Sequence, residues 1–414
     1  MDVVDDVEPA SSISVTLCLG SRSFQMDLAK ALLRNGMLRR VVSFGLDLTI
    51  FDPQDHESLR QIKKYPLYRI ANRILWGVWR RLPMTRRSPH LPVILSVTVA
   101  DRLASRWIPQ GTIYHGWTSL CLNGLRAAKR YGSIAIIENP SMHPRHWQEE
   151  VLKECDLSAV NPRDCRALLP PFLMERMERE FDLCDKIVVP SSIAQRSFEK
   201  LGLGGKAVVI HSGVDHHFFT PPPTPAKGEL FRVCYVGRIE LAKGMTYLLD
   251  AWQRLALKNA ELLLTGEVAP EMQSLIKRDA LPNVRFKGFS SRNEVAQGYR
   301  DSDLFVFPSV NEGLARVLLE AMASEMPVVA TDKSGAEDCI TSGLDGTIVP
   351  ARDATALAEA ILWHFQHREQ SSAMGKAARI KIESQFTVAH YEERVLRLYR
   401  SLAGESILQS KANH

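Results

Sequence analysis

The sequence predicts an α/β fold made of two doubly wound domains. Short apolar runs alternate with helical patterns along the whole chain, which is typical of parallel sheets covered by helices. A proline-rich stretch divides these units into two series, and a length of 414 residues suits two domains better than one. With 45% hydrophobic and 24% charged residues, the composition is that of a globular protein rather than a disordered or fibrous one.

The first series of predicted strands covers residues 13–19, 41–44, 112–115, 134–138, 186–190 and 207–211. The second covers 231–236, 261–265, 284–287, 304–308, 327–331 and 347–349. Between them, 220–225 contains four prolines, which cannot continue a helix or join the middle of a sheet, so we expect the interdomain linker there. The predicted domains are 1–220 and 221–385. In 386–414, apolar residues at helical spacing predict a C-terminal helix that packs back on the body.

The sequence also bears on the cellular setting. No apolar run approaches the ~18 residues that cross a bilayer, and the acidic start lacks the basic residues of a signal peptide. We therefore expect a cytoplasmic protein. The seven cysteines are scattered without a close CxxC pair, which predicts reduced, buried thiols and no metal site.

The stretch between Glu57 and Asp101 contains no acidic residue, and over 60–90 its arginines and lysines interleave with aromatic and aliphatic residues. Such an amphipathic stretch can lie on an anionic membrane surface, which would make the protein peripheral on the inner leaflet. A core-facing helix with exposed arginines explains the pattern equally well. RNA could bind a surface of this kind, but no nucleic-acid motif accompanies it, so we expect no nucleic-acid partner.

The strongest local motif follows the predicted strand 304–308. Glu312 and Gly313 form a turn, and a helical pattern that includes Glu320 comes next. The amides of Gly313, Leu314 and Ala315, at the positive end of this helix, suit a phosphate or another anion. Glu312 and Glu320 can hold hydroxyl groups of two parts of one ligand. On spacing alone, a helix cap at Glu312 and a solvated residue at Glu320 are the somewhat favoured interpretation, since acidic residues are common in first turns.

A second motif runs from Gly237 to Gly244, directly after the strand 231–236. Arg238 and Lys243 in this glycine-flanked loop can clamp a diphosphate, although a solvated loop remains an alternative. The loop is not a Walker A sequence, and no GxGxxG follows a strand, which disfavours a nicotinamide or flavin cofactor.

Together these motifs resemble those of the retaining glycosyltransferases of family 4, which use nucleotide sugars and have the GT-B fold of two facing Rossmann-like domains. The likeness extends to 180–192, 211–215 and 334–337. It implies a metal-independent hexosyltransferase without a cofactor. The implied donor is a nucleotide sugar such as a UDP- or GDP-sugar, and the acceptor a glycan or glycolipid such as a lipid-linked or polysaccharide precursor. The alternatives are a catalytically silent GT-B binding subunit or scaffold, and a phosphorylase or epimerase on the same fold.

The resemblance also implies roles for residues. In the donor site Arg238 and Lys243 would neutralise the diphosphate beside Gly237, Glu312 and the amides of 313–315 would contact the sugar, and Glu320 would bind the ribose. The family's catalytic histidine is best matched by His143, with His115 and His146 as nearby alternatives. Gly20 and Arg22 stand where the family has a glycine-rich loop, and with His115 they are expected to line the cleft. Arg316 departs from the family pattern and could face solvent or an anion.

Overall fold

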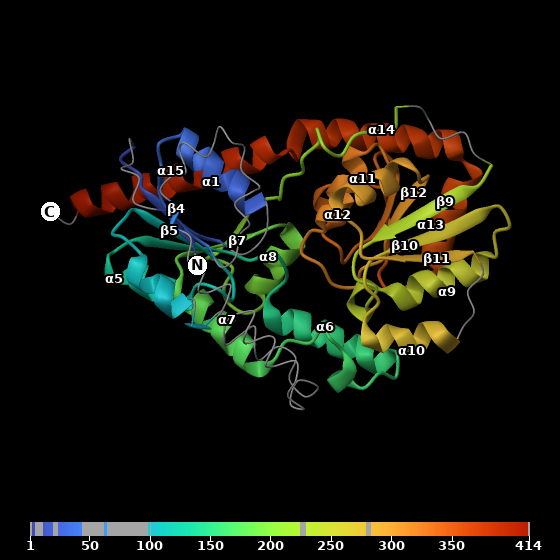
Figure 1. Cartoon of the computed structure of the whole chain (residues 1–414), viewed down its shortest axis with the longest axis horizontal. Helices are drawn as coiled ribbons and strands as arrows, with labels where there is room; N and C mark the ends of the chain where they lie inside the picture. Colours follow the sequence, from blue (N-terminus) through green and yellow to red (C-terminus); the bar gives the residue numbers. More distant parts are fainter. Residues whose placement is uncertain are drawn as a thin grey trace.

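The computed structural model describes residues 2–4, 11–19, 24–43, 62–63, 98–99, 101–223, 229–278 and 283–412. Two α/β domains lie side by side, and a long helical segment at the end of the chain runs along both (Figure 1). All seven cysteines are buried free thiols. Within the described residues, no helix combines the length and the apolar character that a membrane span requires.

The N-terminal sheet contains all six predicted strands of the first series. They are β2 (Val15–Leu19), β3 (Leu38–Ser43), β5 (Ile113–Trp117), β6 (Ile134–Glu138), β7 (Lys186–Val189) and β8 (Ala207–Val209). Their order is β3-β2-β5-β6-β7-β8, with parallel pairing throughout. Two strands that the sequence analysis missed, β1 (Asp2–Val4) and β4 (Ile62–Lys63), add to the β3 edge through antiparallel pairs.

The C-terminal sheet is parallel and contains the second predicted series. Its strands are β9 (Phe231–Val236), β10 (Ala260–Thr265), β11 (Val284–Gly288), β12 (Leu304–Phe307), β13 (Val328–Thr331) and β14 (Thr347–Val349), in the order β11-β10-β9-β12-β13-β14. Every residue of β10, β12 and β13 is buried, because helices cover both faces of the sheet. The strand order reverses between β9 and β12, and doubly wound sheets bind ligands at such a switch point.

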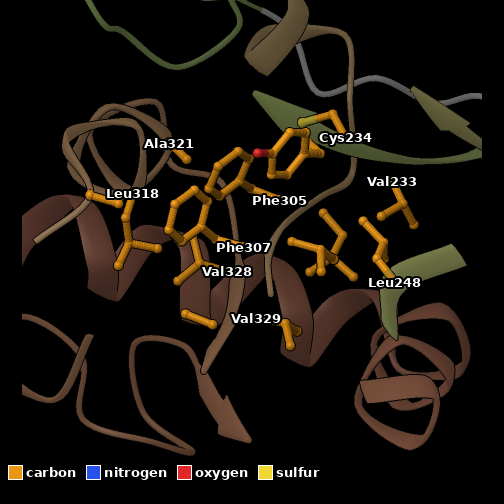
Figure 2. Close-up of a cluster of buried hydrophobic side chains, with 14 of the residues drawn as sticks. Val233, Cys234, Leu248, Phe305, Phe307, Leu318, Ala321, Val328 and Val329 are labelled. Carbon is orange, nitrogen blue, oxygen red and sulfur yellow. The ribbon is translucent and has the colours of Figure 1, made fainter. Parts of the chain in front are cut away.

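The helices of the N-terminal part are α1 (Phe24–Arg34), α5 (Leu122–Arg130), α6 (Pro144–Leu157), α7 (Pro171–Leu183) and α8 (Ser192–Glu199). Those that follow are α9 (Met245–Leu255), α10 (Pro270–Arg278), α11 (Arg292–Arg300), α12 (Arg316–Ala323), α13 (Ala354–Gln366), α14 (Arg368–Gln385) and α15 (Val388–Ala412). Figure 2 shows the core that the C-terminal strands share with α9 and α12, in which Phe305 and Phe307 lie between Val233 and Leu318.

The chain crosses between the domains twice, at adjacent places. Ile210 packs in the N-terminal core, whereas Val214 and Phe219 already pack in the C-terminal core. The first crossing therefore lies at 211–213, before the proline-rich stretch that the sequence suggested as linker. Buried Phe219 explains the difference, because it fixes the chain to the C-terminal domain ahead of those prolines. The return crossing is adjacent, since the amide of Val214 donates to the carbonyl of Phe386 over 2.9 Å.

Two helices pack on the domain opposite to the one that their position in the sequence suggests. The core of the C-terminal domain includes Val151 and Cys155 of α6, although the predicted boundary placed α6 in the N-terminal domain. Ion pairs of 2.6 Å and 2.5 Å join Arg352 to Glu150 and Glu154 of the same helix. At the other end of the chain, α15 packs against the N-terminal sheet and α1 through a face that includes Tyr391, Val395, Leu396, Tyr399 and Leu402.

Candidate active site

A cavity of about 280 Å³ lies between the two domains, at the carboxyl ends of both sheets. Its C-terminal wall includes Gly237, Arg238, Lys243 and Glu312, and its N-terminal wall includes residues at the ends of β5, β6 and β7. Sites for small molecules typically measure about 300–1,000 Å³, so this cavity is large enough for part of a nucleotide sugar. The structure thus brings the two predicted motifs to one site.

The loops after β9, β12 and β13 hold one another in place around the C-terminal wall. The amide of Val310 and the hydroxyl of Ser309 both reach the carbonyl of Ala242, at 3.3 Å and 3.2 Å. Gly244 has a positive φ of 65°, and a side chain at this position would clash with the carbonyl of Pro308. The amide of Glu312 donates to the carbonyl of Lys333 over 2.9 Å, which adds the third loop.

Lys243 and Glu312 are joined directly across the switch point. The ammonium group of Lys243 donates to Oε2 of Glu312, and both side chains are less than one-fifth exposed. Lys243 also lies 5.6 Å above the ring of Trp147, which α6 presents from the N-terminal half of the sequence. This pairing fixes a cation and a carboxylate at the edge of the same cavity, one suited to a phosphate and the other to sugar hydroxyl groups.

Of the two cations, Arg238 is more exposed to solvent than Lys243. Its guanidinium is about half exposed and lies 3.2 Å from the carboxylate of Glu240, which is completely buried. Burial raises the pKa of Glu240, and the positive charges of Arg238 and Lys243 act in the opposite direction. An anion that entered the cavity would therefore meet Arg238 already oriented by a carboxylate behind it.

Helix α12 points its amino end at the cavity. It begins at Arg316, after the three residues whose amides the sequence analysis assigned to its first turn, and no side chain caps it. Leu314, Ala315, Arg316 and Val317 all line the cavity. The open amides and the helix dipole thus add to the positive potential there. Arg316, which departs from the family pattern, belongs to the cavity wall.

Gly313, whose amide was predicted to contact the donor, lies at the contact between the two domains. A side chain here would come within 2.7 Å of the carbonyl of Pro140 and 2.9 Å of Pro190, both from the N-terminal domain. The carbonyl of Gly313 accepts a hydrogen bond of 2.5 Å from the hydroxyl of Ser191. The missing side chain of Gly313 lets the two domains meet.

A second contact between the domains lies beside Gly313 and is centred on Asp338. This carboxylate accepts hydrogen bonds from the hydroxyl of Ser192, at 2.6 Å, and from its amide, at 2.8 Å. It also lies 2.9 Å from Nε2 of His211, at the first crossing. Hydrogen bonds to His211 and Ser192 outweigh burial and lower the pKa of Asp338.

Glu320 lies on α12 beyond the residues that line the cavity. The hydroxyl of Tyr299 is 3.4 Å from its Oε2. Burial raises the pKa of Glu320, while Arg316 and Arg292 favour its charged form. Glu320 is thus a partly buried acid among arginines rather than a solvated helix residue, and its predicted contact with a ribose stays a prediction.

The N-terminal wall is formed by residues that the sequence analysis did not select. Glu138, at the end of β6, lines the cavity together with Trp117, at the end of β5. Glu138 is only 9% exposed, and burial raises its pKa to about 7. Its position at the carboxyl end of a predicted strand was a signal that could have found it, because the same rule selected Glu312.

The predicted catalytic histidine, His143, does not line the cavity. It caps the amino end of α6, where Nδ1 accepts a hydrogen bond of 3.2 Å from the amide of Arg145. Its ring lies 5.4 Å from that of Phe181 and 5.0 Å from that of Phe198, and burial lowers its pKa to about 4. These surroundings are those of a structural histidine, so we do not assign it a catalytic role.

The other predicted cleft residues also lie away from the cavity or cannot be placed. His115 is buried behind Glu138, with Nε2 at 3.8 Å from Oε2 of that residue. His146, on α6, is absent from the part of the cavity wall that the structure describes. Gly20, Arg22 and most of the basic stretch 60–90 lie outside the described residues.

Residues 219–381 match the family described as glycosyl transferases group 1. This match covers most of the C-terminal domain, which carries the motif loops.

Curated relatives agree with this family. The chain is 31% identical over 193 residues to a putative colanic acid biosynthesis glycosyltransferase, WcaL, of Escherichia coli, an alignment that covers 44% of this chain and 48% of the relative. It is also 31% identical over 183 residues to a capsular polysaccharide biosynthesis glycosyltransferase, CapM, of Staphylococcus aureus, with 42% and 47% covered. The chain thus spans about half the length of the curated relatives it matches.

A solved structure extends the likeness to both domains. HepE of Anabaena, solved in complex with UDP-glucose, aligns with 94% of this chain and 100% of its own, at a TM-score of 0.64 and 18% identity. At this identity the likeness establishes the fold alone. The whole chain has the predicted GT-B fold.

Replacing Gly313 by alanine tests whether its missing side chain allows the domains to meet. The added methyl group would overlap Pro140 and Pro190, so we expect a loss of about 1–3 kcal/mol in the free energy of unfolding, measured by chemical denaturation. Gly298→Ala is the control, because a methyl group there has no neighbour within 4 Å and alanine favours the helix α11. Equal effects of the two substitutions would contradict the assignment.

Proposed function

We propose that this protein is a retaining glycosyltransferase that transfers a sugar from a nucleoside diphosphate sugar to a glycan or glycolipid acceptor. The observation that carries the proposal is the convergence of Arg238, Lys243 and the amino end of α12 on one interdomain cavity. The domain match and the glycosyltransferase relatives support the reaction class. The polysaccharide biosynthesis named for those relatives favours a lipid-linked or polysaccharide-precursor acceptor.

The diphosphate of the donor binds between the two cations and the open end of α12. When the bond between sugar and phosphate breaks, negative charge grows on the leaving diphosphate. Cations and amides already aimed at that position interact most strongly at this moment, which lowers the barrier. Glu312, held by Lys243, accepts hydrogen bonds from hydroxyl groups of the donor sugar. Glu320, further along α12, accepts hydrogen bonds from the hydroxyl groups of the ribose.

The proton of the acceptor hydroxyl passes to the leaving phosphate, so no protein base is assigned. Such a transfer keeps the configuration of the sugar, since the acceptor attacks from the face that the phosphate leaves. The contacts of Ser191 with Gly313 and of Ser192 with Asp338 hold the cavity closed between the domains. Closure excludes water and limits wasteful hydrolysis of the donor.

Lys243→Ala tests the assignment of the cations. Loss of a preorganised charge at the leaving group lowers kcat by about 10²–10³-fold, measured as release of the nucleoside diphosphate from a panel of UDP- and GDP-sugars with an acceptor extract. Lys258→Ala is the matched control, because Lys258 is exposed before β10, at the opposite end of the sheet. Wild-type kcat in Lys243→Ala would refute the assignment. Nucleotide binding without release by the wild type would identify a silent binding subunit instead.

The reaction needs no divalent cation, because Arg238, Lys243 and α12 already supply positive charge to the diphosphate. Nucleotide release in the presence of EDTA should therefore equal release in the presence of added Mg²⁺. A loss of more than tenfold in EDTA that added Mg²⁺ restores would show that the metal carries part of this role.

The protein binds the anionic surface of a membrane through its basic segment 60–90. Support comes from the stretch that follows, where Val99, Leu103 and Trp107 are each 44–55% exposed beside Arg102 and Arg106. Apolar side chains flanked by cations are typical of interfacial binding.

Flotation with liposomes that contain anionic lipid tests this association. Replacing Arg73, Arg80 and Arg81 together by glutamate should reduce the amount of protein recovered with the liposomes by at least about tenfold. Each cation near an anionic surface contributes about 1 kcal/mol to binding. The control for the change in net charge is the same replacement of three arginines in the C-terminal domain, namely Arg254, Arg285 and Arg300. Unchanged recovery of the first variant removes membrane binding from the proposal.

A further inference from the structure

The final helix supports the N-terminal wall of the cavity from behind. Tyr391 and Tyr399 of α15 both point into the N-terminal domain, where they are buried in the core. The hydroxyl of Tyr391 donates to Oε2 of Glu138 over 2.9 Å. The hydroxyl of Tyr399 shares a hydrogen bond of 2.6 Å with Nδ1 of His115, directly behind Glu138. Residues more than 250 positions apart in the sequence thus form one polar cluster at the cavity.

Glu138 is held through its backbone carbonyl and through one oxygen of its carboxyl group. Its backbone carbonyl accepts hydrogen bonds from the amide and the hydroxyl of Thr118, at 3.1 Å and 3.0 Å. Tyr391 holds one carboxyl oxygen, and His115 packs behind the same oxygen. Both Glu138 and Arg316 line the cavity, on opposite domains. A carboxyl group fixed in this way has the orientation that a ligand contact requires.

The charge of this cluster changes near neutral pH. Burial raises the pKa of Glu138 to about 7, although the hydrogen bond from Tyr391 and the positive charge of Arg316 on α12 both lower it. On β5, burial lowers the pKa of His115 to about 3, so this ring is neutral across the same range. The buried hydroxyl of Tyr391 on α15 also stays neutral, because burial raises its pKa. Glu138 is thus the group in this cluster that titrates between pH 6 and 8.

We propose that Glu138 contacts the substrate from the N-terminal wall, where its carboxylate accepts a hydrogen bond from a hydroxyl group of the donor sugar, and that Tyr391 is its positioning residue. This inference rests on the proposed function. With the diphosphate against Arg238 and Lys243, as proposed above, a sugar held by Glu312 would lie between the two walls. Glu138 lines the opposite wall of the same cavity. The helix α15 therefore links the end of the chain to recognition of the donor.

Calorimetry tests the proposal without turnover. The probe is whichever UDP- or GDP-sugar raises the melting temperature of the wild type most, compared with its own free nucleoside diphosphate. Charged hydrogen bonds are stronger than neutral ones, so Glu138→Gln at pH 8 should weaken binding of the nucleotide sugar by about tenfold. Binding of the free diphosphate should change by less than about twofold. Wild-type affinity of Glu138→Gln for the nucleotide sugar at pH 8 would overturn the proposal.

The pH dependence separates positioning from a purely structural role. In the wild type, the preference for the nucleotide sugar over the free diphosphate should rise between pH 6 and 8 as Glu138 ionises, and in Glu138→Gln it should stay flat. Tyr391→Phe removes a hydrogen bond that favours the charged form, so the midpoint should move to higher pH. Tyr399→Phe, the same change on the same helix, should leave the midpoint in place.

Three outcomes separate the positioning role, the proposed function and this inference from one another. If Tyr391→Phe weakens binding of both ligands equally, with the midpoint unchanged, Tyr391 is structural and its positioning role is refuted. If no nucleotide sugar binds the wild type, the proposed function fails and this inference fails with it. Wild-type binding of the nucleotide sugar that is unaffected by Glu138→Gln refutes the inference alone.

Discussion

The ion pair between Lys243 and Glu312 is the contact on which the site depends. It joins the loops after β9 and β12, which are neighbouring strands at the point where the order of the C-terminal sheet reverses. Gly244 allows the loop after β9 to approach Pro308 closely, and Glu312 is tied in turn to the loop after β13. Because these loops are mutually fixed, the cations and the open end of α12 face the cavity before any ligand arrives. Preorganised charge of this kind costs no rearrangement during the reaction.

The N-terminal domain contributes the opposite wall of the cavity. Each domain also includes one helix that, by its position in the sequence, would be expected in the other domain. Helix α6 packs in the C-terminal core, and α15 packs on the N-terminal sheet. The two crossings lie next to each other, at 211–213 and 386–388, so they form one narrow connection. This arrangement lets the walls meet through small contacts such as Ser191 with Gly313. Ser212, within the first crossing, itself lines the cavity.

The features that could be predicted best from the sequence are those that depend on residues close together in the chain. Twelve of the fourteen described strands were predictable, most of them because buried parallel strands appear as apolar runs. Arg238, Lys243 and Glu312 were found because they follow such runs closely. His143 could not be judged locally, since its packing against Phe181 and Phe198 depends on α7 and α8. Glu138 ends a predicted strand and could have been selected from that position, but its contact with Tyr391 could not be predicted, because this partner comes from the other end of the chain. The linker was misplaced because prolines break secondary structure without marking where a core ends.

We propose that one interdomain cavity holds the diphosphate of a nucleotide sugar between Arg238, Lys243 and the amino end of α12. A crystal structure of the full chain, soaked with UDP or GDP at saturating concentration, tests it most directly. We expect the diphosphate within hydrogen-bonding distance of both cations and of the first amides of α12. A nucleotide bound elsewhere, with these groups left without a ligand, would contradict it.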